Sequence, residues 1–146
     1  MNMSPHAEGT LIERVTALYF DYAAAVDDVD METLRSLLTE DVTFESNRRI
    51  SAVIVGADAL LKAYAPLLAQ PGTVSRHLVS NVRVLRVDGD LIHTHAYFTA
   101  TFHFEDTTSV QTGCYRDVHV QTAEGLRIRH KRVEVDPAII HPRPTA

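Results

Sequence analysis

The sequence predicts an α+β domain in which three helices come first and a strongly curved, mainly antiparallel sheet follows. Segments with helical periodicity fall before Gly72, and four long segments with strand character follow it. Short turns rich in Gly, Asp and Glu separate the long segments, as is typical of an antiparallel meander. Strands of this length twist and curl, so we expect a cone-shaped roll whose N-terminal helices pack on the concave face of the sheet.

The composition fits one globular domain and excludes several functions. The chain has 146 residues, of which 45% are hydrophobic and 23% charged, so it can bury a sizeable core. The formal net charge of -5 argues against nucleic acid as the main partner. The single cysteine, Cys114, fits a reducing compartment. No apolar run is long enough to span a bilayer and residues 1–10 do not form a secretory signal. We therefore expect a soluble, cytoplasmic, single domain over residues 1–146, with no membrane partner and with loose ends at 1–8 and 138–146.

The first helix is predicted from Glu8 to Val26, where apolar residues recur every three or four positions. Tyr22 and Val26 lie on this apolar stripe, and Asp27 follows about 100° around the helix axis. The helix end therefore leads inward and leaves Asp27 beside the buried stripe. A helix C-terminus carries partial negative charge, so a carboxylate is unfavourable there. Asp27 is either a solvated loop acid or an acid that borders a cavity.

Shorter elements fill the chain up to Gly72. Asp30 is a good N-cap for a second helix, so it has a structural role rather than a chemical one. Two short strands, Val42–Glu45 and Ile50–Val55, are predicted from their alternating side chains. Gly56 then opens a third helix, which Pro66 should limit.

The long strands of the meander are bounded by turn residues. Asp88-Gly89-Asp90 is a strong hairpin signal between the first two of them. The predicted bounds are Thr73–Val87, Leu91–Phe104, Ser109–Thr122 and Leu126–Asp136.

The strand Leu91–Phe104 has two clearly different faces. Phe98 and Phe102 belong to the apolar set, which must face the core. His93 and His95 belong to the polar set and should point away from the core. A metal site needs three or four convergent ligands, and this strand offers no acid or cysteine to complete one. We therefore expect no metal here, and a hydrated sheet face or a subunit interface explains the two histidines.

His77 lies between apolar neighbours on the first long strand. Histidine is suited to proton transfer near neutral pH, and a neighbouring carboxylate would fix its tautomer and support its charged form. His77 as a catalytic base therefore requires an acid nearby. A structural histidine with satisfied hydrogen bonds is the alternative.

The last two strands leave the orientation of their side chains open. Tyr115 and Asp117 share one face of the third long strand, but parity does not decide which face is inside. The fourth strand changes phase between Ile128 and Val133, which predicts a bulge near residues 130–132. Such a bulge could turn Arg132 toward the cavity as an anion-binding group. An exposed arginine is an equally good interpretation.

These features together resemble the nuclear transport factor 2-like superfamily, and within it the SnoaL-like branch. The resemblance rests on the Tyr-x-x-x-x-Asp helix end at Tyr22 and Asp27, the Asp-capped second helix, Gly56, His77 and the Gly-x-Tyr-x-Asp motif at 113–117. It covers roughly residues 11–137. The branch includes scytalone dehydratase and bile-acid 7α-dehydratase, to whose acid, tyrosine and histidine Asp27, Tyr22 and His77 correspond.

The resemblance implies a conical pocket in a homodimer or homotrimer, with a His–Asp pair that moves protons. The favoured hypothesis is a cofactor-independent acid–base enzyme: a dehydratase, isomerase or cyclase acting on a small, largely apolar polyketide, terpenoid or steroid. Asp27 and His77 would be catalytic, and no cofactor or metal is expected. The expected substrate-binding residues are Tyr22, Tyr115, Arg132, Phe98 and Phe102. The alternatives are a non-catalytic binding module for small molecules, or an accessory subunit that resembles the small subunit of ring-hydroxylating dioxygenases.

Overall fold

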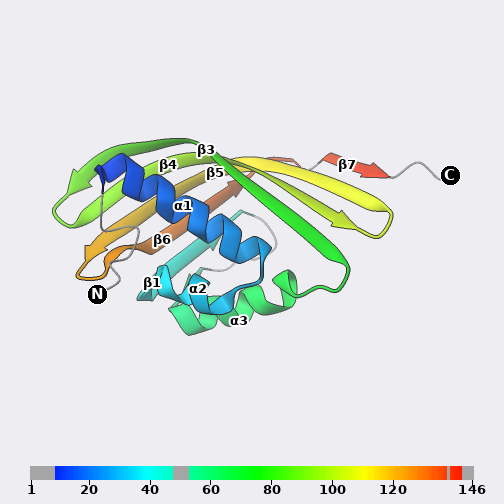
Figure 1. Cartoon of the computed structure of the whole chain (residues 1–146), viewed down its shortest axis with the longest axis horizontal. Helices are drawn as coiled ribbons and strands as arrows, with labels where there is room; N and C mark the ends of the chain where they lie inside the picture. Colours follow the sequence, from blue (N-terminus) through cyan, green and yellow to red (C-terminus); the bar gives the residue numbers. More distant parts are fainter. Residues whose placement is uncertain (1–8, 48–52, 138, 143–146) are drawn as a thin grey trace.

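The computed structural model describes residues 9–47, 53–137 and 139–142. Within these ranges three helices and the strands β1 and β2 come first, and the four long strands of a curved mixed sheet follow (Figure 1). No described helix is long and apolar enough to cross a membrane. The elements are α1 (Leu11–Asp27), α2 (Met31–Ser36), β1 (Leu38–Ser46), β2 (Ile54–Val55), α3 (Ala57–Leu68), β3 (Thr73–Asp88), β4 (Leu91–Phe104), β5 (Thr107–Thr122), β6 (Gly125–Val135) and β7 (Ile139–Pro142).

The sheet has the strand order β2-β1-β6-β5-β4-β3, and β7 pairs with the outer part of β5. β3 to β6 form the predicted antiparallel meander, whereas β1 runs parallel to β6. Figure 1 shows α1 lying across the curved sheet, with α2 and α3 beside the β1 end. The predicted α+β roll is therefore confirmed.

Helix α1 begins later than the periodicity indicated because a capping box sets its start. The side chain of Thr10 accepts a hydrogen bond from the Glu13 N–H, and the Glu13 carboxylate accepts one from the Thr10 N–H. The buried face carries Val15, Leu18, Tyr19, Tyr22 and Val26. This face packs mainly toward β3, and it fixes the position of Asp27 at the last residue of the helix.

Three sequence predictions need correction. The first short strand, predicted at Val42–Glu45, is longer: β1 covers Leu38–Ser46, because Leu38 already pairs with Ile128 of β6. The second short strand covers only Ile54–Val55; residues 48–52 lie outside the described part of the chain. The C-terminal end was expected to be loose from residue 138. Instead, β7 pairs with the first residues of β5, a part of that strand with which β6 does not pair. Residues 1–8, 138 and 143–146 lie outside the described ranges.

Candidate active site

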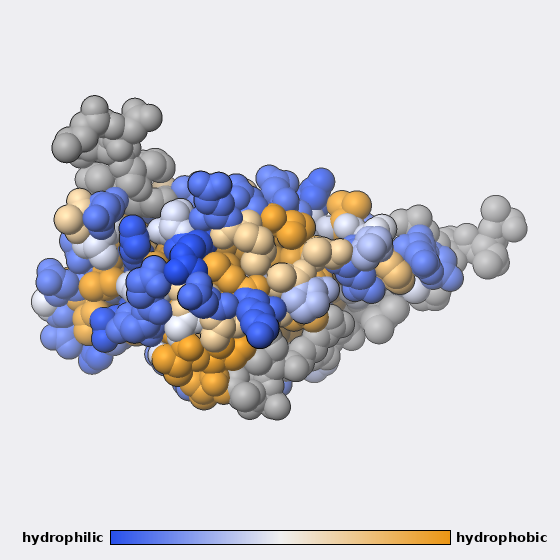
Figure 2. Space-filling model, turned by 90° about the horizontal axis from the view of Figure 1, so that it is seen from below, coloured by the Kyte–Doolittle hydropathy of each residue, from blue (hydrophilic) through white to orange (hydrophobic). Residues whose placement is uncertain are grey.

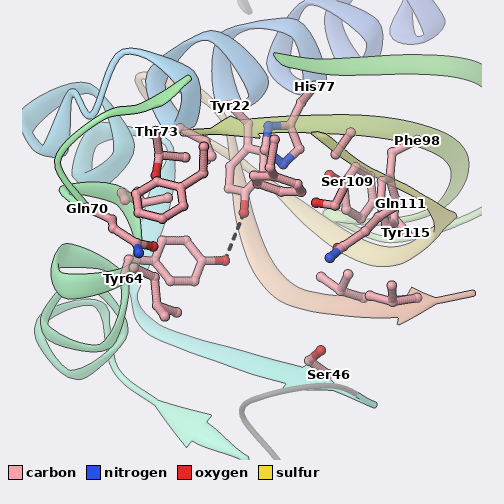
Figure 3. A pocket seen from close by; sticks show the side chains of 18 of the residues that line it. Tyr22, Ser46, Tyr64, Gln70, Thr73, His77, Phe98, Ser109, Gln111 and Tyr115 are labelled. Atoms are coloured by element: carbon pink, nitrogen blue, oxygen red, sulfur yellow. Dashed lines mark hydrogen bonds between the residues drawn. The ribbon is translucent and has the colours of Figure 1, made fainter. Parts of the chain in front are cut away.

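A cavity of about 420 Å³ lies between the curved sheet and the helices. Its lining is largely apolar and aromatic, and includes Val26, Phe44, Phe98, Phe102 and Val133. Polar groups interrupt this lining at His77, Gln111, Ser109, Gln70 and Thr73. Figure 3 shows these side chains converging from β3, β4, β5 and the α3 region on one space. An apolar pocket with a few polar groups is the usual form of a small-molecule site.

Asp27 and His77 form a hydrogen-bonded pair at the edge of this cavity. The Asp27 Oδ1 atom lies 2.6 Å from His77 Nδ1, and Asp27 Oδ2 accepts the backbone N–H of His77 at 2.8 Å. Ser75 Oγ donates a third hydrogen bond to Asp27 Oδ1 at 2.9 Å. The two side chains are only 10% and 12% exposed. The juxtaposition that the sequence predicted is therefore present, and the carboxylate is fixed by three donors.

The pair has a clear orientation relative to the cavity. His77 lines the cavity, whereas Asp27 lies behind it and does not line it. Because Asp27 occupies Nδ1, the other ring nitrogen, Nε2, is left for a ligand. Phe102 supports the imidazole from β4 with its ring edge-on, at a centroid distance of 5.6 Å. This is the arrangement in which a carboxylate selects the tautomer of a histidine.

Three tyrosines line the cavity, and they differ in what their hydroxyl groups contact. The Tyr22 hydroxyl is 2.8 Å from the hydroxyl of Tyr64 on α3. Among the described residues, none forms a hydrogen bond with the Tyr115 hydroxyl. Burial raises the pKa of Tyr22 and the pKa of Tyr115 well above the ordinary phenol value. Both phenols are therefore protonated near neutral pH, and Tyr115 has a proton to donate into the cavity.

The ring of Tyr115 is held between two other aromatic rings. It stacks on Phe98 at 4.7 Å and on Tyr19 at 5.7 Å. Gly113 allows this packing, because a Cβ atom there would lie 2.7 Å from the Phe98 ring and 2.1 Å from the Glu134 carbonyl oxygen. The structure thus places Tyr115 and Asp117 on the inner face of β5, a choice that parity left open.

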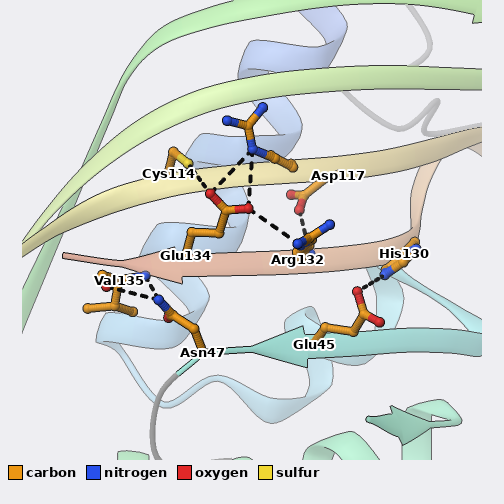
Figure 4. A network of polar contacts seen from close by, with 9 residues as sticks. Glu45, Asn47, Cys114, Asp117, His130, Arg132, Glu134 and Val135 are labelled. Carbon is orange, nitrogen blue, oxygen red and sulfur yellow. Dashed lines mark hydrogen bonds and ion pairs between the residues drawn. The ribbon is translucent and has the colours of Figure 1, made fainter. Parts of the chain in front are cut away.

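The prediction for Arg132 is wrong. Its side chain is 54% exposed, points away from the cavity and pairs with Glu134 at 3.5 Å (Figure 4). A bulge is present just before the predicted residues 130–132, since Val118 pairs with His130 and the next residue, His119, pairs with Ile128. The extra residue in β6 turns Lys131 inward and Arg132 outward, because neighbouring side chains on a strand point to opposite faces.

Other functional groups were not identified from the sequence. The sequence pattern does not distinguish Tyr64 from the apolar residues of the third helix, and it does not single out Gln111 or Ser109 on β5. The parity of Val133 extends back to Lys131 only because the bulge lies before residue 130, which the sequence did not locate. His95 also differs from expectation, since it is only 7% exposed although it lies on the outer face. There its ring packs edge-on against Tyr97 at 5.3 Å, which excludes water.

Comparison with known proteins agrees with this fold. A family model for the SnoaL-like domain matches residues 8–132. No protein with a curated description matches the sequence. The match over these residues confirms the resemblance seen in the sequence.

Several crystal structures are similar to this chain. A candidate aromatic ring hydroxylase from Novosphingobium aromaticivorans has 22% identity and a TM-score of 0.78, over 87% of this chain and 90% of its own. A candidate scytalone dehydratase from the same species has 18% identity and a TM-score of 0.78, over 90% of this chain and 88% of its own. The beta subunit of benzoate 1,2-dioxygenase from Burkholderia mallei has 15% identity and a TM-score of 0.77, over 88% and 93%. At these identities the likeness shows that the chain has the nuclear transport factor 2-like fold. It does not show that the activities are shared.

Proposed function

The chain belongs to the SnoaL-like domain family, and we propose that it is a cofactor-independent acid–base enzyme of the dehydratase, isomerase or cyclase type. The observation that carries this proposal is the placement of His77. Its Nδ1 is bound to a buried carboxylate, while the ring lines an apolar cavity. A structural histidine would not need to line a cavity of ligand size.

In this mechanism His77 is the general base. Its Nδ1–H is donated to Asp27, so Nε2 carries the lone pair and accepts a proton from the carbon next to a substrate carbonyl. Asp27 stabilises the imidazolium that results. The Tyr115 hydroxyl donates a hydrogen bond to the carbonyl oxygen as it gains enolate character.

For a β-hydroxy ketone, the same groups complete the elimination of water without any further reagent. The enolate re-forms the carbonyl and expels the β-hydroxyl group. This leaving group takes the proton from the His77 imidazolium and departs as water, so the base is regenerated. The same proton transfers without a leaving group would give an isomerisation.

The cavity fits the substrate class inferred from the sequence. A volume of about 420 Å³ with mostly apolar walls suits a small compound with fused rings, such as a polyketide, terpenoid or steroid. Phe98 and Phe102 supply flat apolar walls. Gln111 and Ser109 offer hydrogen bonds to a second oxygen on the same molecule.

Turnover of β-hydroxy ketones with one to three rings, followed by the absorbance of the enone product, tests the proposal. His77→Ala and Asp27→Ala should each lower kcat by about 10²–10⁴-fold, the usual contribution of a general base. His93→Ala is the matched control, because His93 lies on the outer face of β4 beside Arg86. Full activity in both cavity variants would rule out this mechanism. Binding without turnover, together with a large loss of thermal stability in both variants, would instead identify a non-catalytic binding module.

A second candidate function is an accessory subunit, as in the dioxygenase beta subunits of this fold. Exposed apolar side chains favour it, including Val55 on β2 and Leu67 on α3. Figure 2 shows apolar side chains in the middle and at the lower edge of one face, with polar side chains mainly to the left and along the top. Size-exclusion chromatography with light scattering separates the cases. A homodimer or homotrimer that turns over the ketones favours the enzyme, whereas an inactive chain that co-purifies with a larger iron–sulfur protein favours the subunit.

A further inference from the structure

A buried ion pair lies behind the cavity wall, and it takes no part in the proposed acid–base reaction. Lys131 Nζ donates to Asp117 Oδ2 at 3.0 Å, and both side chains are 0% exposed. The other carboxylate oxygen of Asp117 accepts the backbone N–H of Arg132 at 3.0 Å. Neither Lys131 nor Asp117 lines the cavity, so neither can touch a substrate.

The ammonium group is surrounded by the rings of three tyrosines. Lys131 Nζ lies 3.6 Å from the centroid of the Tyr115 ring, 4.2 Å from that of Tyr22 and 5.6 Å from that of Tyr19. Tyr115 and Tyr22 reach the cavity, whereas the Tyr19 hydroxyl is bonded to Thr94 at 2.9 Å. The charge of Lys131 therefore reaches the cavity only through the two lining tyrosines.

Stability alone is a weak reason for this pair. A buried ion pair generally stabilises a fold no more than apolar side chains of the same size would, because both charges lose their hydration. Burial lowers the pKa of Lys131, and the Asp117 carboxylate opposes that effect. The chain nevertheless places the pair directly against the one lining tyrosine whose hydroxyl has no partner among the described residues.

We propose that Lys131 is a positioning residue for Tyr115. Its ammonium group, anchored by Asp117, fixes the Tyr115 ring and strengthens the phenol as a hydrogen-bond donor to the substrate oxygen. A cation on the face of an aromatic ring draws electron density from it, which makes the O–H group of a phenol a better donor. This inference rests on the proposed role of Tyr115 in the acid–base reaction, but it concerns binding and can be measured without turnover.

The test compares the affinities of 2-naphthol and naphthalene, which differ by one hydroxyl group. The ratio of the two dissociation constants reports the hydrogen bonding of the probe oxygen, and the absorbance of bound naphthol reports its ionised fraction. Lys131→Met alone leaves Asp117 buried without a partner and can prevent folding. The deciding variant is therefore Lys131→Met combined with Asp117→Asn, which removes both charges and keeps an acceptor for the Arg132 N–H.

We expect this double variant to lower the preference for 2-naphthol by about three- to thirtyfold, with the affinity for naphthalene unchanged. Tyr115→Phe should cause a similar loss, and the double variant should add nothing to it, because the pair acts through that hydroxyl. Ile128→Val, a change in the core of the same strand, should leave the ratio unchanged.

His93→Ala, on the outer face of β4, should also keep the ratio. Because the ratio is measured without turnover, a protein that shows the expected ratios but turns over no ketone separates a failure of the proposed function from a failure of this inference. Three results would overturn the inference. The first is a wild-type protein that binds 2-naphthol no better than naphthalene. The second is a folded double variant that retains the full preference for 2-naphthol. The third is a double variant that lowers this preference as much in a Tyr115→Phe protein as it does in the wild type.

Discussion

The two carboxylate pairs of this domain, Asp27 with His77 and Asp117 with Lys131, differ in whether they reach the cavity. Asp27 and His77 are 10% and 12% exposed, and the imidazole lines the cavity. Lys131 and Asp117 are 0% exposed and lie behind a layer of tyrosine rings. Both pairs have short contacts, 2.6 Å and 3.0 Å, so distance does not separate them.

Access to the cavity therefore decides what each pair can do. A group that exchanges a proton with a ligand must reach it within hydrogen-bond distance, and only His77 meets this condition. A sealed pair can act only through the residues around it. The comparison also predicts that the stability of the fold responds differently to mutation of the two pairs.

The largest expected effect comes from breaking the sealed pair. Lys131→Met should lower the free energy of unfolding by about 3–5 kcal/mol, because it leaves the Asp117 carboxylate buried without its counter-charge. Urea denaturation followed by circular dichroism measures this. The variant that combines it with Asp117→Asn should lose clearly less. Equal losses in the single and double variants would show that packing, and not charge, holds this region.

Acidification should also lower the stability of the fold, through the buried histidine His119. Burial lowers the pKa of His119 from 6.5 to about 4, and its Nδ1 has no partner among the described residues. Between these values the unfolded chain binds the proton and the folded chain does not, so stability falls as the pH drops from about 6.5 to 4. The loss should reach about 3 kcal/mol.

Urea denaturation at a series of pH values measures this dependence. His119→Gln keeps a partner for Thr94, which lies 2.9 Å from His119 Nε2, and should flatten the curve between pH 6.5 and 4. An unchanged acid dependence in that variant would assign the effect to other groups.

Breaking the open pair should have the smallest effect on stability. His77→Ala removes one hydrogen bond to a charged group, so it should cost about 2 kcal/mol, while Asp27 keeps the hydrogen bonds from Ser75 Oγ and the backbone N–H of residue 77. Thermal unfolding checks this against Lys131→Met. A loss as large as that of Lys131→Met would make the open pair a structural one and remove the contrast.

Much of the fold could be predicted because its signals are local. The periodicity around Tyr22 and Val26 placed Asp27 at the inner end of α1, and the alternation of β4 assigned Phe98 and Phe102 to the inner face. The Asp88-Gly89-Asp90 turn defined the β3–β4 hairpin within one residue. The pairing of Asp27 with His77 was also expected, although it joins elements far apart in the chain, because a family resemblance supplied what spacing could not.

The sequence by itself determined the class of the fold and the order of its elements, and the family resemblance added the two residues of the open pair, Asp27 and His77. Only the tertiary structure decided which face of β5 is inside, that β1 runs parallel to β6, and that Tyr64 meets Tyr22. It also decided that Lys131, and not Arg132, turns inward. The physical reason is that side-chain direction on a strand depends on its register with the neighbouring strands. A single extra residue in β6 reverses that direction, and the pairing that locates this residue is made with β5 and not within β6.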